Sequence, residues 1–253
     1  MKKMFALMLV VLMGVCLFTA CAPANTEDTL VMATNANFPP YEYMEGNEYA
    51  GIDIELAEKI AEKLGKKLVI ENVEFGSIVS GVQTGKYDVG IAGLTVTEDR
   101  KTQVNFTDSY ATGVQVVIVK EGSEIGTIED LSGESVMIGV QQDTTGHIYA
   151  SDTVENGGYG EDHVIAYLNG ADAVNALISN KVNAVIIDNE PAKAFVAANE
   201  GLKILETEWI TEDYAIAVNK DDTQLLADIN QALAELKADG TIDKIVNKYI
   251  KAE

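Results

Sequence analysis

The chain has 253 residues, and its 40 acidic side chains against 18 basic ones give a formal net charge of −22 at pH 7. Such acidity argues against nucleic acid or an anionic membrane surface as a binding partner, because like charges repel. The length suffices for one large domain or for two of ordinary size.

The first twenty residues predict a secretory signal peptide. Lys2 and Lys3 precede an apolar run over residues 4–18, which is too short for a spanning helix and ends in small residues. These residues stand directly before Cys21, as in the bacterial lipobox, although Phe18 stands where leucine is more usual. We therefore expect cleavage after residue 20, a lipid on Cys21 and a tether over residues 21–28, which together anchor an exported protein to the membrane at the cell surface or in the periplasm.

The two cysteines have no other use in this interpretation. Cys16 leaves with the signal peptide and Cys21 carries the lipid, so none remains for a disulfide, a metal or thiol catalysis. The sequence also contains no recognisable metal-ligand cluster or phosphate-binding loop, and we expect no cofactor and no metal.

The first third of the mature chain alternates strand-like and helix-like segments. Strands are predicted over residues 30–34, 67–75 and 87–92, and helices over residues 53–64 and 77–84. The longer helix carries apolar residues at every fourth position from Ile52 to Leu64, with Asp53 as its expected N-cap and Gly65 as its end.

The alternation continues to the C-terminus. Strands are predicted over residues 113–120, 135–140, 183–188 and 214–218, and helices over residues 145–154, 171–181, 190–199, 223–238 and 241–249. Strands that alternate with helices predict the α/β class with mostly parallel sheets.

Two extended segments divide this pattern into two lobes. Residues 112–116 and 211–215 are expected to be hinge crossings between lobe 1, formed by residues 29–111 and 216–253, and lobe 2, formed by residues 117–210. The cleft between the lobes would then be bordered by the carboxyl ends of strands, where open α/β sheets bind ligands.

Aromatic and small residues follow the predicted strands of lobe 1. Phe38 lies in a proline-rich loop after the first strand, Phe75 ends the second, and Gly93 and Thr95 follow the third. Glycine permits a close approach of the backbone to a ligand. The structural alternatives are that the two aromatics pack on their own lobe and that Thr95 caps a turn.

Lobe 2 offers donors and one carboxylate. The run D-T-T-G at residues 143–146 precedes a helix, whose first N–H groups attract anions, and Thr145 would add a donor. Capping by Asp143 or Thr144 is the structural alternative. Asp188 ends a buried strand, where a carboxylate requires a cation or hydrogen-bond donors, unless it caps the helix that follows.

Arg100 is the only arginine of the chain. Its planar guanidinium can meet a carboxylate with two parallel hydrogen bonds, which a lysine cannot do. The alternative is a surface ion pair with Glu98 or Asp99, worth less than about 1 kcal/mol.

Taken together, these groups complement the zwitterion of an α-amino acid. The carboxylate seat would consist of Arg100, Thr95 and Thr145, and the ammonium seat of Asp188, Thr95 and the carbonyl of Gly93. The two aromatics would flank the ligand.

The chain resembles family 3 of the bacterial solute-binding proteins, whose members bind glutamine, histidine or lysine, arginine and ornithine. The resemblance covers residues 30–249 and is carried by G-I-D-I-E-L at residues 51–56 and by T-x-T-x-x-R at residues 95–100. It implies the two-lobe, type II periplasmic-binding-protein fold, closure by hinge motion, a free amino acid as ligand, the permease of an ABC importer as partner, and a monomer. The ligand-binding residues that it implies are Asn35, Phe38, Phe75, Gly93, Thr95, Arg100, Gln141, Thr145 and Asp188.

Two departures from the family pattern bear on specificity. Asn35 stands where many members for basic ligands have aspartate, and Gln141 is again neutral and polar. Two amides suit a neutral polar ligand such as glutamine, which we favour, because each can donate and accept. Glu42 or Asp53 could still serve a basic ligand. Asp143 replaces a glycine, which puts the backbone shape of its loop in question.

Three classes of function remain open at this point. We favour a non-catalytic receptor, in which both lobes contact the ligand and the ligand thereby stabilises the closed state. A dehydratase on the same fold would require a positioned acid or base, and the two histidines, His147 and His163, lie in no recognisable motif and are expected to be exposed. A surface adhesin is the third class, since a lipid anchor would expose the protein.

Overall fold

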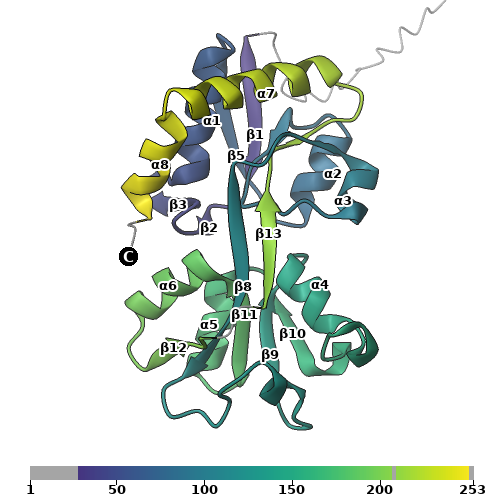
Figure 1. The fold of residues 1–253 in the computed structure, drawn as a ribbon, viewed down its shortest axis with the longest axis vertical. Helices are drawn as coiled ribbons and strands as arrows, with labels where there is room; N and C mark the ends of the chain where they lie inside the picture. Colours follow the sequence, from purple (N-terminus) through teal and green to yellow (C-terminus); the bar gives the residue numbers. More distant parts are fainter. Residues whose placement is uncertain (1–27, 207–208, 251–253) are drawn as a thin grey trace, which may run out of the picture.

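The alternating pattern folds into two lobes, stacked along the long axis and joined by two long strands (Figure 1). This computed structural model describes residues 28–206 and 209–250, so the signal peptide and Cys21 lie outside the described residues. The two α/β lobes and their paired connections confirm the predicted fold class.

Lobe 1 contains a five-stranded sheet of order β5-β1-β6-β14-β7. Its strands are β1 (Thr29–Thr34), β5 (Lys67–Asn72), β6 (Val89–Gly90), β14 (Ala217–Val218) and β7 (Asn105–Phe106). Strand β1 runs parallel to β5 and β6, and β14 runs antiparallel to both of its neighbours. A small antiparallel sheet of β2 (Asn37–Phe38), β3 (Glu42–Glu45) and β4 (Glu48–Ala50) lies beside it.

Five helices cover lobe 1. They are α1 (Ile52–Lys63), α2 (Ser77–Gln83), α3 (Glu98–Gln103), α7 (Thr223–Ala238) and α8 (Thr241–Tyr249). The last two return to lobe 1 after the chain has passed through lobe 2, and α7 lies across the top of the molecule in Figure 1.

Lobe 2 contains a six-stranded sheet of order β10-β9-β11-β8-β12, with β13 also paired to β8. Its strands are β8 (Ala111–Lys120), β9 (Ile138–Gln141), β10 (Val164–Tyr167), β11 (Ala184–Asp188), β12 (Leu202–Ile204) and β13 (Ile210–Tyr214). Its helices are α4 (Thr145–Ser151), α5 (Gly170–Ile178) and α6 (Asn189–Ala198), with short 3-10 turns at Glu129–Ser132, Val154–Asn156 and Glu161–His163.

The prediction of mostly parallel sheets is wrong, because both large sheets are mixed: in each of them some neighbouring strands are parallel and others are antiparallel. Strands β9, β10 and β11 are parallel to one another, but β8 runs antiparallel to β11, β12 and β13. The reason is the double crossing between the lobes: β8 enters lobe 2, and the chain must leave it in the opposite direction along β13.

Strands β8 and β13 are paired where they cross between the lobes, with Gly113 opposite Glu212 and Ala111 opposite Tyr214. The strand predicted over residues 214–218 is two strands, because Tyr214 ends the ladder with β8 and Ala217 begins a new one with β6. The predicted strand 87–92 is reduced to β6 because the following residues leave the ladder toward the cleft.

Helix α1 shows how the sequence pattern becomes packing. Leu56 and Ile60 are about 1% exposed and belong to the core of lobe 1. The prediction of Asp53 as N-cap is wrong: the helix begins after Gly51, whose φ of 122° is available to glycine, and a Cβ there would lie 2.2 Å from the carbonyl oxygen of Tyr41. Asp53 is buried in the first turn of the helix.

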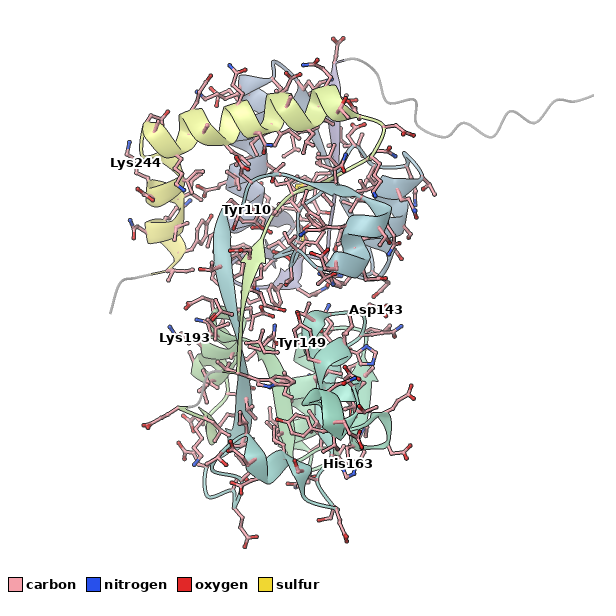
Figure 2. All side chains as sticks on the ribbon, turned by 45° about the vertical axis from the view of Figure 1, so that its right-hand side comes forward. Tyr110, Asp143, Tyr149, His163, Lys193 and Lys244 are labelled. Atoms are coloured by element: carbon pink, nitrogen blue, oxygen red, sulfur yellow. The ribbon has the colours of Figure 1, made fainter. Side chains whose placement is uncertain are left out.

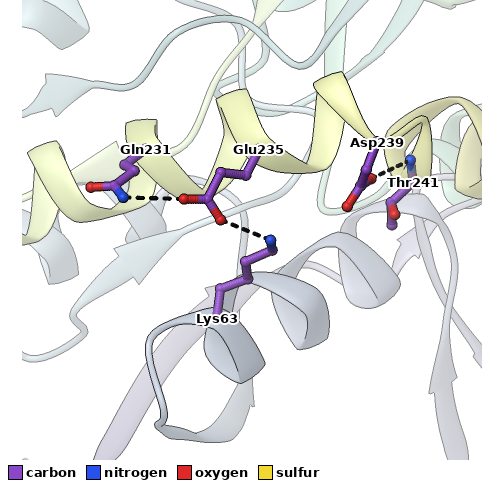
Figure 3. A network of polar contacts seen from close by, with 5 residues as sticks. All are labelled: Lys63, Gln231, Glu235, Asp239 and Thr241. Carbon is purple, nitrogen blue, oxygen red and sulfur yellow. Dashed lines mark hydrogen bonds and ion pairs between the residues drawn. The ribbon is translucent and has the colours of Figure 1, made fainter.

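Polar contacts also connect the helices of lobe 1 at their surface (Figure 3). The Lys63 ammonium lies 2.8 Å from a carboxylate oxygen of Glu235, and the Gln231 amide donates to the other oxygen at 3.1 Å, which joins α1 to α7. At the end of α7, the Asp239 carboxylate accepts the Thr241 N–H at 2.9 Å. Solvent-exposed pairs of this kind contribute at most about 1 kcal/mol each. None of the helices within the two described ranges combines the length and apolar composition needed to cross a membrane.

Replacing a buried isoleucine is expected to lower the free energy of unfolding much more than replacing an exposed one. Ile118 on β8 is fully buried, so we expect Ile118→Ala to lower the free energy of unfolding by about 2–5 kcal/mol through lost transfer energy and a residual cavity. Ile148→Ala, at a side chain 50% exposed, is the matched control and is expected to change it by no more than about 0.5 kcal/mol. Urea titrations of both variants measure this, and equal effects would contradict the burial assigned to Ile118.

Candidate functional site

A cavity lies between the lobes. It is lined by Asn35, Phe38, Glu42, Phe75, Ala92, Gly93, Thr95, Arg100, Gln141, Thr144, Thr145 and Asp188. The structure thus brings together all nine residues that the sequence singled out for ligand binding.

The carboxyl ends of strands supply most of this lining, as expected for open α/β sheets. In lobe 1, Asn35 follows β1 directly, and Gly93 and Thr95 lie on the segment that leaves β6. In lobe 2, Gln141 ends β9 and Asp188 ends β11. Gly93 has a φ of 49°, and a Cβ there would lie 3.0 Å from the ring of Phe38, so a larger residue would push this aromatic.

Arg100 is only 7% exposed, which makes the surface ion pair with Glu98 or Asp99 wrong. Its Nη1 donates to the carbonyl of Thr95 at 2.8 Å, and its Nη2 donates across the cleft to the carbonyl of Asp143 at 3.0 Å. The centre of the guanidinium lies 5.3 Å from the centroid of the Phe75 ring. These contacts fix the plane of the guanidinium at the wall of the cavity.

The D-T-T-G loop faces lobe 1 at the start of α4, and Figure 2 shows Asp143 on the edge of lobe 2 nearest the other lobe. Thr144 is the N-cap, because its hydroxyl accepts the His147 N–H at 3.2 Å. Asp143 has a φ of 63°, which lies in the left-handed region that glycine favours and that aspartate tolerates. The loop therefore keeps a glycine-like backbone and points the Asp143 carbonyl at Arg100.

The expectation that both histidines are exposed is wrong. His147 is half-buried and accepts the Asp143 N–H at its Nδ1, 3.2 Å away. His163 is also half-buried, with its Nδ1 3.0 Å from the carbonyl of Val136, and it lies at the end of lobe 2 far from the cleft (Figure 2). Both rings serve local structure rather than the cavity lining.

Asp188 stands at the N-cap position of α6 but makes no capping hydrogen bond with its side chain. Instead it accepts a hydrogen bond from the hydroxyl of Tyr214, the last residue of β13. Burial, and after it the negative charge of Glu212, raise the pKa of the Asp188 carboxyl to about 7. A positive group that entered the cavity beside Asp188 would oppose both causes.

Two amides bridge the lobes at another point of the cavity. Gln141 Nε2 donates to Asn35 Oδ1 at 3.0 Å, and Asn35 Nδ2 donates to the carbonyl of Val73 at 2.7 Å. The Asn35 amide is thereby oriented with its oxygen toward lobe 2.

Two buried carboxyl groups lie on the lobe 1 side. Glu42 lines the cavity, and burial together with the neighbouring Asp53 raises its pKa well above its usual value. Asp53 accepts the Gly93 N–H at 2.7 Å and the Tyr110 hydroxyl at 2.8 Å, while burial raises its pKa to about 6. Asp53 therefore holds the Gly93 segment in place instead of capping α1.

Glu212 and Gln115, on the two crossing strands, are residues that our reading of the sequence missed. Glu212 is 5% exposed, and its carboxylate contacts side chains from both lobes. The available signal was the alternation along β13, which places Glu212 on the same face as the buried Tyr214, while Thr211 and Asp213 are exposed. A charged residue on the buried face of a strand is rare unless it is paired, which marks Glu212 as a candidate functional residue.

Among the described residues, no group of three or more histidine, cysteine, aspartate or glutamate side chains is arranged to hold a metal ion.

Comparisons with known proteins agree with the two-lobe fold. The family model of the bacterial extracellular solute-binding proteins, family 3, matches residues 30–252. The arginine-binding extracellular protein ArtP of Bacillus subtilis is 30% identical over 97% of this chain and 98% of its own. A solved structure of an ancestral arginine-binding protein bound to glutamine is 40% identical, covers 89% of this chain and 99% of its own, and superposes with a TM-score of 0.81. The ancestral amino acid-binding protein AncCDT-1, described as a precursor of cyclohexadienyl dehydratase, is 31% identical over 88% of this chain and 96% of its own, with a TM-score of 0.80.

Proposed function

Because the chain belongs to family 3 of the bacterial extracellular solute-binding proteins, we propose that it captures a free L-amino acid outside the cytoplasm and delivers it to the permease of an ABC importer. The observation that carries this proposal is the cavity between the lobes, in which a buried arginine of lobe 1 and a buried aspartate of lobe 2 line one small space. An α-amino acid brings the two opposite charges that these side chains require.

Arg100 is the proposed partner of the ligand carboxylate. A guanidinium has five N–H donors, and the carbonyls of Thr95 and Asp143 occupy two of them. The remaining donors can meet a carboxylate in the cavity, with Thr145 beside them. Phe38 and Phe75 would flank the ligand.

Asp188, Thr95 and the carbonyl of Gly93 form the proposed ammonium seat. Asp188 lacks a cationic partner among the described residues that line the cavity, apart from Arg100 at the carboxylate seat. An ammonium would stabilise its ionised form in a site where burial favours the neutral one.

For the side chain of the ligand we propose a neutral polar group such as that of glutamine. The support is the amide pair of Asn35 and Gln141, which offers donors and acceptors without a charge. A basic side chain is the alternative, since Glu42 lines the same cavity. Similar proteins are described for both kinds of ligand, one as arginine-binding and one as bound to glutamine.

The proposed mechanism is closure about the two crossing strands. We assign residues 29–111 and 216–253 to lobe 1, residues 117–210 to lobe 2, and residues 112–116 and 211–215 to the hinge. A ligand that contacts Arg100 and Asp188 at once binds the closed state better than the open one, and this difference in affinity drives closure. The closed, ligand-bound monomer would then be the form that the permease recognises.

We further propose that the protein is anchored by lipid on Cys21 after removal of residues 1–20. The support is the sequence alone, a charged start followed by an apolar run and a cysteine after small residues. Several acyl chains on one residue give stable attachment.

Two other functions compete with the receptor. A dehydratase is the first, since the similar protein AncCDT-1 is described as a precursor of one, although it is itself an amino acid-binding protein. An adhesin is the second. Binding of one amino acid per chain without turnover, measured by calorimetry and by chromatography of the recovered ligand, would support the receptor against both.

A thermal-shift screen tests the function directly. The lipid-free mature chain, refolded to remove any co-purified ligand, is heated with each of the twenty common amino acids. A ligand at about 100 times its Kd adds roughly 2.7 kcal/mol, which raises the Tm by roughly 5–10 °C. We expect such a shift with one small group of polar amino acids. A comparison of the shifts with glutamine and with arginine distinguishes a neutral polar side chain of the ligand from a basic one. No shift with any of the twenty would contradict the proposal.

A further inference from the structure

Glu212 connects the two lobes and the hinge through a single carboxylate oxygen. Its Oε2 accepts the Thr95 hydroxyl of lobe 1 at 3.2 Å and the Thr145 hydroxyl of lobe 2 at 2.9 Å. The same oxygen accepts Nε2 of Gln115 on β8 at 2.9 Å. Glu212 itself lies on β13, is 5% exposed and does not line the cavity.

We propose that Glu212 is a positioning residue of the binding site, which orients the hydroxyls of Thr95 and Thr145 toward the ligand and holds the lobes in the closed arrangement. The first half of this statement rests on the proposed function, and the second half does not.

The orientation of the two threonine hydroxyls follows from the number of protons that each group can donate. An ionised carboxylate only accepts hydrogen bonds, and a threonine hydroxyl has one proton to donate. Since both threonines donate to Glu212, each presents only lone pairs to the cavity that it lines. Lone pairs can accept from a ligand ammonium but cannot donate to a carboxylate.

The composition of the two proposed seats changes accordingly. Thr95 keeps its place in the ammonium seat, and the Thr145 hydroxyl joins it there instead of donating to the ligand carboxylate. Arg100 then remains the side-chain donor for the carboxylate. The ammonium would be surrounded by the Asp188 carboxylate and two hydroxyl oxygens, which is a suitable set of acceptors for its three N–H groups.

The link to closure follows from where the partners lie. Thr95 belongs to lobe 1 and Thr145 to lobe 2, so a rotation that opens the cleft separates them and breaks at least one bond to Glu212. The carboxylate stands on the crossing strand β13, opposite Gly113 of β8, and is therefore placed at the axis of that rotation. Breaking a hydrogen bond to a buried charge is costly, so Glu212 favours the closed state.

The test compares Glu212→Gln with Asp213→Asn. Both remove one negative charge from β13 and keep the side-chain shape. Asp213, however, is exposed, and among the described residues its carboxylate accepts a hydrogen bond from the Ser109 hydroxyl at 3.4 Å, with no contact to the cavity. Small-angle scattering of the ligand-free proteins measures closure. Calorimetry measures the binding of L-glutamine and L-arginine and of their desamino analogues, 4-carbamoylbutanoate and 5-guanidinopentanoate.

For Glu212→Gln we expect a larger radius of gyration without ligand and a roughly 10- to 100-fold loss of affinity for the amino acid that the wild type binds. The desamino analogue, which has no ammonium, is expected to lose less affinity than the amino acid, because it loses only the part of the affinity that comes from the favoured closed state. Asp213→Asn is expected to match the wild type in every measurement.

Two results would overturn the proposal in whole or in part. Unchanged scattering and unchanged affinity in Glu212→Gln would remove both halves. An equal loss for the amino acid and its analogue would remove the orientation half, because weaker closure alone affects both ligands equally. If the wild type binds neither amino acid, the proposed function fails for these ligands, whereas the scattering comparison still decides the closure half. Should Glu212→Gln not fold, Gln115→Met removes one of the three bonds and must change scattering and affinity in the same direction.

Discussion

Replacing Arg100 by alanine is expected to weaken amino-acid binding by roughly 30- to 5,000-fold, as found when one partner of a buried, hydrogen-bonded charge pair is truncated. The proposed carboxylate seat would lose its guanidinium, and the ligand carboxylate would be buried without a cationic partner. The variant would also lose the hydrogen bond from Arg100 to the Asp143 carbonyl, which joins the lobes. Calorimetric titration with the amino acid selected by the thermal-shift screen measures the effect.

Two further variants separate the role of the planar guanidinium, with its several donors, from that of a positive charge alone. Arg100→Lys keeps one positive charge but cannot reach two carbonyls and a carboxylate together, so an intermediate loss is expected. Lys101→Ala removes the neighbouring cation of α3, which is exposed and paired with Glu98, and should leave the affinity unchanged. Near-normal affinity in Arg100→Ala would refute the assignment of the carboxylate to this residue.

The long, regular elements could be predicted from the sequence because their periodicity is strong. Helix α7 (Thr223–Ala238) lies where the apolar pattern places it, and α1 differs from its prediction by one residue at each end. The small sheet of β2, β3 and β4 was not predicted, since strands of two to four residues are too short to show an alternation. Its existence depends on pairing between segments rather than on any one of them.

Some residues of the candidate site could likewise be predicted from the sequence, and others could not. Residues at or shortly after the carboxyl ends of strands, such as Asp188 and Thr95, could be located because these strand ends meet at one edge of a sheet. Glu212 could not, because its partners are separated from it by 117, 97 and 67 residues along the chain. Asp53 was assigned a local cap, whereas its carboxylate accepts an N–H 40 residues away.

The second large effect is expected from pH, because the proposed ammonium seat contains a carboxyl group that is half-protonated near neutrality. Burial and Glu212 raise the pKa of Asp188 to about 7, and the ligand ammonium requires the ionised form. Below that pH, binding must displace a proton from Asp188. We therefore expect the affinity to fall by up to about tenfold per pH unit, or roughly 100-fold at pH 5, and to be constant above pH 7.

Asp188 has the opposite effect on the stability of the unliganded protein. In the unfolded chain its proton leaves near pH 3.8, whereas in the folded chain it stays bound until about pH 7. The folded state binds more protons throughout this window, so the free energy of unfolding falls as the pH rises from about 4 to 7. Asp53, whose pKa is raised to about 6, acts in the same direction.

Calorimetry at pH 5, 6, 7 and 8 measures both trends, and buffers of different ionisation enthalpy count the proton released at pH 6. Asp188→Asn removes the titrating group beside Glu212 and Tyr214, so it should bind weakly at pH 8 and lose most of the pH dependence. Asp213→Asn, on the exposed side of β13, should retain the wild-type profile. A wild-type affinity that is the same at pH 5 and pH 8 would show that the ammonium does not bind at Asp188, and the charge pattern of the cavity would then favour a ligand held by its carboxylate and side chain alone.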